Sequence, residues 1–129
     1  MKSISKVKKI TVITVLPVIA FFMMSLVINQ GDGVPEKYKN MKNPVKSEKE
    51  SIASGKELYT KNCKMCHGAE GKGGKMAGKS DFTSKEFKAF TDGEIFYYTT
   101  EGFGKMPAYK NKIKGDNDRW NLVNYMRSL

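Results

Sequence analysis

Residues 63–67 carry the sequence CKMCH, which contains both cysteines and the single histidine of the 129-residue chain. Cys63 and Cys66 stand three positions apart and His67 follows directly, so the three side chains belong to about one turn of the chain. The region around them, residues 51–129, is short. A domain this small buries little apolar surface and often depends on disulfides, metals or a cofactor for its stability. The CKMCH motif is where such support is expected.

The C-x-x-C-H pattern is typical of c-type haem attachment. Each thiol can add to one haem vinyl group, and the imidazole of His67 then lies under the iron as its proximal ligand. Three other interpretations are weaker. A disulfide between Cys63 and Cys66 would close a very small loop and stabilise little. A redox dithiol expects a βαβ context, and a zinc site needs further Cys or His residues that the chain lacks. We therefore predict one covalent haem c per chain.

The second axial ligand of the iron cannot be another histidine of this chain, and methionine is the favoured choice. Five of the eight methionines lie at the N-terminus, in the apolar segment, in the linker or inside the motif. Of the other three, Met76 is close to His67 in sequence, and Met126 lies on the apolar stripe of the last helix. Met106 is in an irregular loop before a proline that restricts its backbone, and we predict it as the distal ligand. Met76, or an iron that is open or bound by Lys105, are the alternatives.

The region after residue 47 is predicted to be all-α. A capping box at Ser47 begins a helix over residues 48–65, where apolar and small residues recur at spacings of three and four. A second capping box at Thr91 begins a short aromatic helix that ends at Gly102. Asp116 is expected to cap the last helix, which carries an apolar stripe. No run alternates as a strand would. Three or four helices with long irregular connections are therefore expected.

A glycine-rich segment, GAEGKGGKMAG, follows the motif at residues 68–78 and must form a loop. Residues 73–80, GGKMAGKS, also satisfy the G-x-x-x-x-G-K-[ST] pattern of phosphate-binding loops. Such a loop follows a buried strand and opens a helix, and no strand is predicted here. We interpret the match as chance and expect no nucleotide partner.

The N-terminal part of the chain is predicted to anchor it in a membrane. Residues 10–28 are almost wholly apolar, and a helix of this length spans about 29 Å, close to the roughly 30 Å hydrocarbon core of a bilayer. Four lysines in the basic N-terminus, residues 1–9, place that end in the cytoplasm and residues 31–129 on the periplasmic side. A cleaved signal peptide is the alternative, but the apolar run is longer than usual and no clear small-x-small site follows it.

Residues 29–50 contain two glycines and two prolines without an apolar period, and are predicted to be a flexible linker before a domain at residues 51–129. The chain has a net charge of +10. The 14 basic and 9 acidic residues of the domain leave it positive. This charge suits either a solvated surface or docking with an acidic redox partner, and the scattered lysines favour no nucleic acid.

With these motifs stated, the domain resembles the class I cytochromes c, a family of small monohaem electron carriers, over about residues 51–129. Gly55 and Tyr59 stand eight and four residues before Cys63, where that family has a glycine and an aromatic that pack the first helix on the last. Leu122 and Tyr125 are similar to the matching positions of the last helix. The resemblance implies the cytochrome c fold around a covalently bound haem.

The segments around residues 92–96, 102–109 and 118–129 are similar to a bacterial branch of the family, some members of which are subunits of membrane respiratory complexes. One feature differs from many relatives. No proline lies between His67 and Met106, whereas relatives often have one whose carbonyl accepts the imidazole N–H. The group that orients His67 therefore stays open.

The sequence predicts a membrane-tethered monohaem cytochrome c with His67 and Met106 as axial ligands. It would pass single electrons between a quinol-oxidising complex and a terminal oxidase or reductase, as a carrier that is not itself an enzyme. Two alternatives stay open. One is a haem protein with an open or labile distal site that binds ligands or acts as a peroxidase, and the other is a fixed cytochrome subunit of an oxidase or reductase.

Overall fold

A computed structural model of the chain describes residues 33–74 and 80–129. Its helices are α2 (Glu36–Lys39), α3 (Lys49–Asn62), α4 (Lys64–His67), α5 (Lys85–Ala89), α6 (Asp92–Glu101) and α7 (Asp116–Ser128). Within these residues no strand forms, and the only β-type pairing is an isolated bridge between Phe103 and Met106. The all-α prediction is confirmed for the described part. The described part has six helices, three long and three short, where the sequence predicts three or four.

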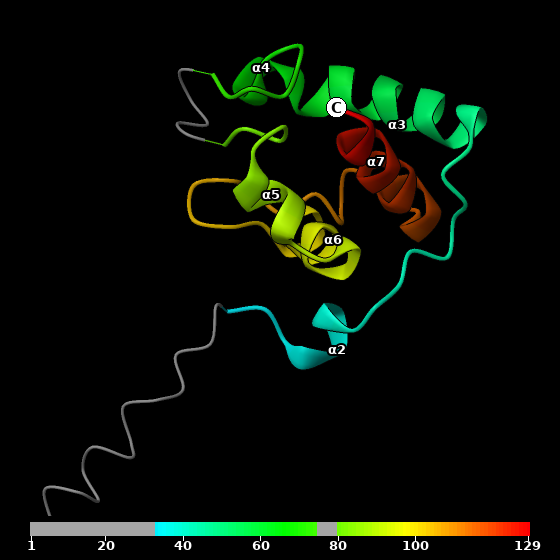
Figure 1. The fold of residues 1–129 in the computed structure, drawn as a ribbon, viewed down its shortest axis with the longest axis vertical. Coiled ribbons are helices and arrows are strands. Elements are labelled where there is room, and N and C mark those ends of the chain that lie inside the picture. The colour runs from blue at the N-terminus through cyan, green and yellow to red at the C-terminus, as the bar shows by residue number, and fades with distance from the viewer. Residues whose placement is uncertain (1–32, 75–79) are drawn as a thin grey trace, which may run out of the picture. The chain divides into compact units, whose positions relative to one another are not determined.

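Helices α3 and α7 pack against each other through small and aromatic side chains (Figure 1). A Cβ atom on Gly55 of α3 would lie 2.1 Å from the backbone oxygen of Asn121 of α7, so only glycine fits at this contact. One turn further on, the rings of Tyr59 and Tyr125 lie 5.1 Å apart between centroids. Leu122 is almost fully buried beside them. These residues make the contact that the resemblance implied, and they fix the end of α3 that leads into the motif.

The ends of the helices follow the sequence in part. At α6 the predicted capping box forms, because Thr91 Oγ1 accepts from the Glu94 N–H and Glu94 Oε2 accepts from the Thr91 N–H. Gly102 ends that helix as predicted. The predicted box at Ser47 is wrong, since the first helical hydrogen bond of α3 runs to the Glu48 carbonyl, one residue later.

The cap of α7 is also one residue from the predicted position. Gly115 is the N-cap, and Asp116 is the first residue of the helix. The Asp116 carboxylate instead forms an ion pair with the guanidinium of Arg119, one turn further along the same helix. Aspartate in the first turn still interacts favourably with the helix dipole. The aspartate therefore marks the start of the helix, although the cap itself lies one residue earlier.

Residues 34–48, which the sequence predicts to be linker, pack on the domain instead. We call this segment the N-terminal strap. Val34 is buried, and the ring of Tyr38 in α2 lies 4.8 Å from the ring of Tyr97 in α6. The Asn124 amide of α7 donates to the carbonyl oxygens of Val45 and Lys46, at 3.2 Å each. The compact unit accordingly begins at Val34, whereas the sequence predicts that the domain begins at residue 51.

The packing of the strap on the domain is explained by residues outside the strap. Its few apolar side chains show no helical or strand period, but they pack against the core beside α6. Gly93 of α6 leaves room for the strap backbone, because a Cβ at this position would lie 1.8 Å from the Tyr38 oxygen. Asn124 then satisfies backbone carbonyls that a free linker would leave to water.

The attachment of the strap can be tested at Asn124. Replacing Asn124 with Ala removes the donor to both strap carbonyls and to Ser51 Oγ. We expect the free energy of unfolding to fall by about 2 kcal/mol, because several buried polar groups lose their partner. Limited proteolysis should then cut within residues 34–48. Asn117→Ala, at an exposed position of the same helix, is the matched control. Equal cleavage patterns for wild type, Asn124→Ala and Asn117→Ala would contradict this account of the strap.

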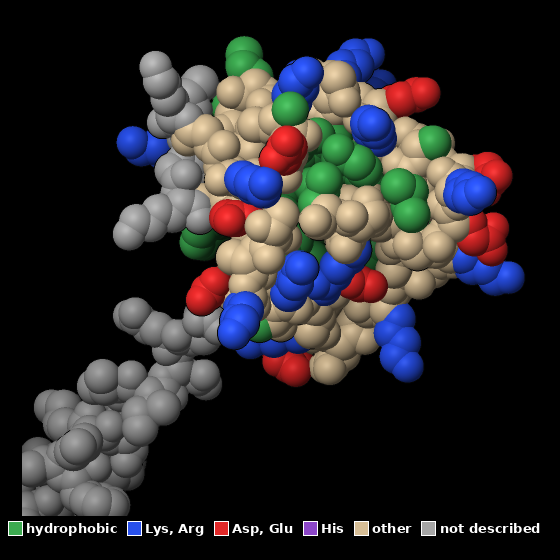
Figure 2. All heavy atoms as spheres, turned by 45° about the horizontal axis from the view of Figure 1, so that its top comes forward, with side chains coloured by type: hydrophobic (Ala, Val, Ile, Leu, Met, Phe, Trp, Pro, Cys, Tyr) green, Lys and Arg blue, Asp and Glu red, His purple; other side chains and the backbone are tan. Residues whose placement is uncertain are grey.

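Residues 1–9, the predicted transmembrane segment 10–28 and the first residues of the predicted linker lie outside the described part of the chain. Among the helices that the structure does describe, none is long and apolar enough to cross a membrane. On the face shown in Figure 2, basic and acidic side chains are interspersed around a central group of hydrophobic ones.

Candidate functional site

The end of α3 and the short helix α4 bring the motif residues together. Cys63 is the C-cap of α3 and the N-cap of α4. The Cys63 carbonyl accepts hydrogen bonds from the N–H groups of Cys66 and His67, at 3.0 and 2.9 Å. Gly68 ends α4 at a φ of 79°, and the following loop turns back so that the Gly73 N–H donates to the His67 carbonyl at 3.1 Å. The motif is thus held in one compact turn, as its spacing predicts.

The two cysteines are free thiols in different surroundings. Cys63 is buried and Cys66 is half-buried, and no disulfide joins them. Burial, with a smaller contribution from Cys66, raises the pKa of the Cys63 thiol to about 11. A redox-active dithiol needs a lowered thiol pKa in an exposed and electropositive setting. The geometry therefore disfavours the dithiol interpretation and leaves two unpaired thiols for attachment.

His67 is a neutral imidazole against an aromatic ring. Burial lowers its pKa from the ordinary value, so the neutral form that can ligate a metal predominates at pH 7. Its ring stacks on Phe82, with 4.8 Å between the centroids. The Nδ1 atom is buried and has no hydrogen-bond partner among the described residues. No described residue therefore orients His67 through a hydrogen bond to Nδ1, and the contact with Phe82 is what holds the ring.

Met106 lies in a tight turn at the start of the loop between α6 and α7. Phe103 and Met106 exchange backbone hydrogen bonds of 3.0 and 2.9 Å. Gly102, at a φ of 83°, makes this turn possible, since a Cβ there would lie 2.5 Å from the Met106 oxygen. The Met106 side chain is half-buried and lines a cavity of about 270 Å³. The walls of this cavity are mainly apolar and include Phe82, Phe87, Ile95, Phe103 and Met126.

Phe82 connects the two predicted iron ligands. Its ring contacts the His67 imidazole and also lines the cavity that contains Met106. The residues fit a haem by their chemistry: two free thiols and a neutral imidazole lie at one side, and an apolar cavity with a thioether lies at the other. Apolar walls with a few polar groups are what a cofactor pocket needs.

The other candidates of the sequence are placed as follows. Met126 is buried in α7 as part of the hydrophobic core, and it also lines the cavity that contains Met106. Lys105 is exposed next to Met106. Met76 and most of the segment that matches the phosphate-binding pattern lie outside the described residues.

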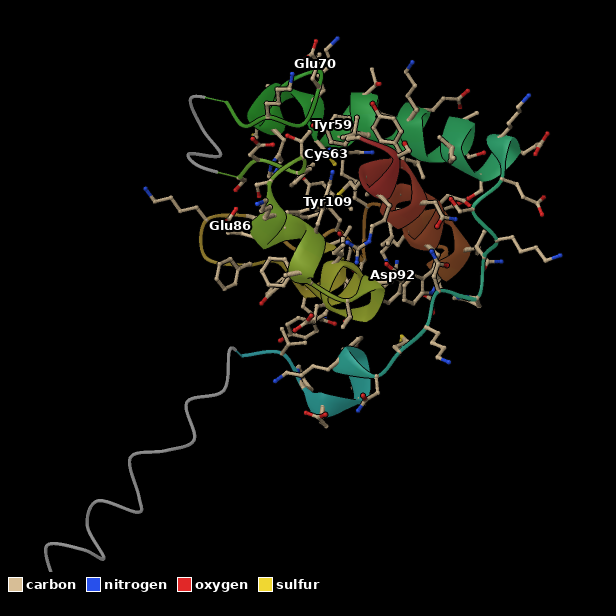
Figure 3. All side chains as sticks on the ribbon, in the orientation of Figure 1. Tyr59, Cys63, Glu70, Glu86, Asp92 and Tyr109 are labelled. Carbon is tan, nitrogen blue, oxygen red and sulfur yellow. The ribbon has the colours of Figure 1, made fainter. Side chains whose placement is uncertain are left out.

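The sequence did not single out Phe82 or Tyr109. The Tyr109 hydroxyl donates to the Asn62 carbonyl at 3.0 Å, directly before the attachment motif (Figure 3). Burial raises the pKa of Tyr109, and the nearby Cys63 and Cys66 raise it further. An aromatic residue three positions after Met106 was visible in the sequence, but its partner in α3 is 47 positions away. No local pattern marks such a contact.

Comparison with known proteins agrees with this geometry. Residues 50–126 match the family model described as cytochrome c oxidase, cbb3-type, subunit III. The chain belongs to this family of c-type cytochromes. The class I cytochrome c resemblance is thereby confirmed, and with it a haem c cofactor and haem-based electron transfer. The haem site is expected within the matched residues, which include the motif, the Met106 loop and nearly all of α7.

This cytochrome is also similar to the thiosulfate dehydrogenase of Stutzerimonas stutzeri (strain A1501). The two are 34% identical over 82 residues, which make up 60% of this chain and 27% of that relative. The chain thus spans about a quarter of the length of the curated relative that it matches. The likeness covers only a part of that relative, and the activity of the whole relative does not transfer with it.

Proposed function

We propose that this protein is a membrane-anchored monohaem cytochrome c that transfers single electrons in a respiratory chain. Cys63 and Cys66 hold one haem through thioether bonds, His67 is the proximal ligand and Met106 the distal ligand. The bound haem supplies a one-electron couple between ferrous and ferric iron, with a relatively high potential for His/Met ligation. The observation that carries the proposal is the compact turn with two free thiols and a neutral imidazole, linked through Phe82 to an apolar cavity containing Met106.

Different segments of the chain would hold the two faces of the haem. The α4 turn presents the thiols and the imidazole from one side, so attachment and proximal ligation are fixed together. The turn at Gly102 presents the Met106 thioether from the loop. The mainly apolar walls of the cavity would limit the contact of a bound haem with water, and this burial adjusts the potential of the iron. His67 and Met106 would both hold the iron of a bound haem, and two such ligands would keep its coordination the same in both oxidation states, which favours fast electron transfer.

We place the domain on the periplasmic side of the cytoplasmic membrane, with residues 10–28 as the single span. Its partners would be a quinol-oxidising complex and a terminal oxidase or reductase. The positive charge of the domain supports docking on acidic partners.

A fixed cytochrome subunit of an oxidase or reductase is the second candidate. It is favoured by the family model, whose description names an oxidase subunit, and by the relative that is a thiosulfate dehydrogenase. Purification of the full chain from its membrane in mild detergent separates the two. A partner at fixed stoichiometry supports the subunit, and isolation of the chain alone supports the carrier.

The ligation is tested on the haem-loaded full chain by visible absorption. We expect a low-spin spectrum, one haem per chain, and a weak far-red sulfur-to-iron band in the ferric state. Met106→Ala should abolish that band and open the iron to carbon monoxide in the reduced state. The matched control is Met126→Leu, which keeps the volume of the second thioether in the cavity and should keep the band.

Two outcomes would contradict the assignment. A band lost in Met126→Leu but kept in Met106→Ala would make Met126 the ligand. A high-spin ferric wild type that binds carbon monoxide rapidly would instead support ligand binding or peroxidase chemistry.

A further inference from the structure

The loop that carries Met106, residues 102–115, is tied to the helices on either side of it. Near its middle, the N–H of Tyr109 donates to the Thr99 carbonyl of α6 at 3.1 Å. Near its end, Ile113 is buried, and its carbonyl accepts a hydrogen bond from the Arg119 guanidinium of α7. These attachments connect the loop to α6 and α7. They do not connect it to the α3–α4 side, where the attachment motif lies.

The side chain of Tyr109 makes that second connection. Its hydroxyl donates to the carbonyl of Asn62, the last residue of α3 and the neighbour of Cys63. The phenol is close enough to Cys63 and Cys66 for both thiols to affect its titration. Figure 3 shows Tyr109 and Cys63 in the interior, below α3. One residue thus bonds α6 through its backbone and α3 through its side chain.

The link between Tyr109 and Met106 is short and stiff. The intervening residues are Pro107 and Ala108, so the two Cα atoms are at most about 10 Å apart. The proline ring fixes its own φ and restricts the backbone of Met106 before it. A shift of the Tyr109 backbone is therefore expected to move the Met106 backbone as well.

We propose that Tyr109 is a positioning residue for the distal ligand: its hydroxyl ties the Met106 loop to the end of α3 beside the attachment cysteines, and so keeps the Met106 thioether on the iron. The inference rests on the proposed function, because it assigns a role only if Met106 is a ligand. Loss of the hydroxyl leaves the ring in place and frees the middle of the loop from α3. Met106 then leaves ferric iron more readily.

The test uses the haem-loaded full chain and follows the far-red band of the ferric protein as the pH is raised. In Tyr109→Phe we expect the band to disappear at a midpoint about 0.7 pH unit lower, which is about fivefold in the exchange equilibrium and is the usual effect of one neutral hydrogen bond. As the pH rises, hydroxide or a deprotonated lysine amine becomes available to replace the Met106 thioether on the iron. The midpoint moves down because a weaker Met106 bond is replaced at a lower concentration of that ligand. Tyr97→Phe removes a hydroxyl from α6 as the matched control and should not move the midpoint.

A merely structural role for Tyr109 gives a different pattern. The free energy of unfolding, measured by circular dichroism, would fall in Tyr109→Phe while the midpoint of the far-red band stayed that of wild type, and this result overturns the inference alone. A wild type without the band, or a band that survives Met106→Ala, overturns the proposed ligation and the inference together. A lowered midpoint in Tyr109→Phe but not in Tyr97→Phe supports both.

Discussion

The double substitution Cys63→Ala and Cys66→Ala should remove all haem that stays with the polypeptide on a denaturing gel. In the proposed site the two thiols are the groups that bond covalently to the cofactor, and both are free for that reaction. Each single variant should retain haem through one thioether, with the reduced absorption band shifted because one vinyl group stays unsaturated. Haem stain, set against the amount of protein in the same lane, measures the effect.

Met65→Ala provides the control for this experiment. Met65 lies between the two cysteines, and its side chain is 84% exposed. Its truncation changes the motif without touching the thiols or the imidazole, and staining should equal that of wild type. Haem that remains with the double variant would contradict thioether attachment at these positions. A wild type that stains no more than the double variant would support the alternative interpretation of Cys63 and Cys66 as a redox-active dithiol.

The sequence predicted best where a signal and its partner are neighbours. The capping box of Thr91 and Glu94 lies within four residues and forms as expected. The turn of the CKMCH motif is equally local. The stripe on the last helix gave the right buried face, with Leu122 and Met126 both in the core. In each case the residues that decide the geometry are three or four positions apart, so their spacing alone contains the answer.

The parts that the sequence did not predict depend on distant partners. Asn124 binds the strap from about 80 positions away, and no pattern in either segment indicates this contact. The contact of Phe82 with His67 likewise arises only when the segment around residue 82 folds back, through the hydrogen bond from the Phe82 N–H to the Gly71 carbonyl. Such contacts are set by packing, and a pattern confined to one segment does not contain them.

The strap also changes the interpretation of the short domain. A domain of residues 51–129 alone buries little apolar surface for its stability. Tyr38, Met41 and Val45 add apolar surface against it, and Val34 is buried as well. The stable unit is thus the domain together with its strap, and experiments that begin the chain at residue 51 would expose the faces of α6 and α7 that the strap covers.

Gly55→Ala should destabilise the protein by at least ~3 kcal/mol, the largest effect of any single methyl group added in α3. Alanine in a helix is intrinsically better than glycine by up to about 1 kcal/mol. Here that gain is outweighed, because the new Cβ would lie 2.1 Å from the backbone oxygen of Asn121 and 2.8 Å from Tyr125 Cβ. Neither atom can move aside unless the backbone of α7 moves with it. Overpacking of this kind typically costs 1–3 kcal/mol, and more when backbone blocks the site.

The added methyl group must push α3 away from α7, which separates Tyr59 from Tyr125 and loosens the end of α3 that presents Cys63. Guanidinium unfolding of the haem-loaded chain, followed by circular dichroism, measures the loss. Ser54→Ala is the control, since Ser54 is the exposed neighbour on the same helix and its change should raise stability by a few tenths of a kcal/mol. If Gly55→Ala unfolds at the same denaturant concentration as Ser54→Ala, then the close contact of α3 with α7 is not what holds the motif in place.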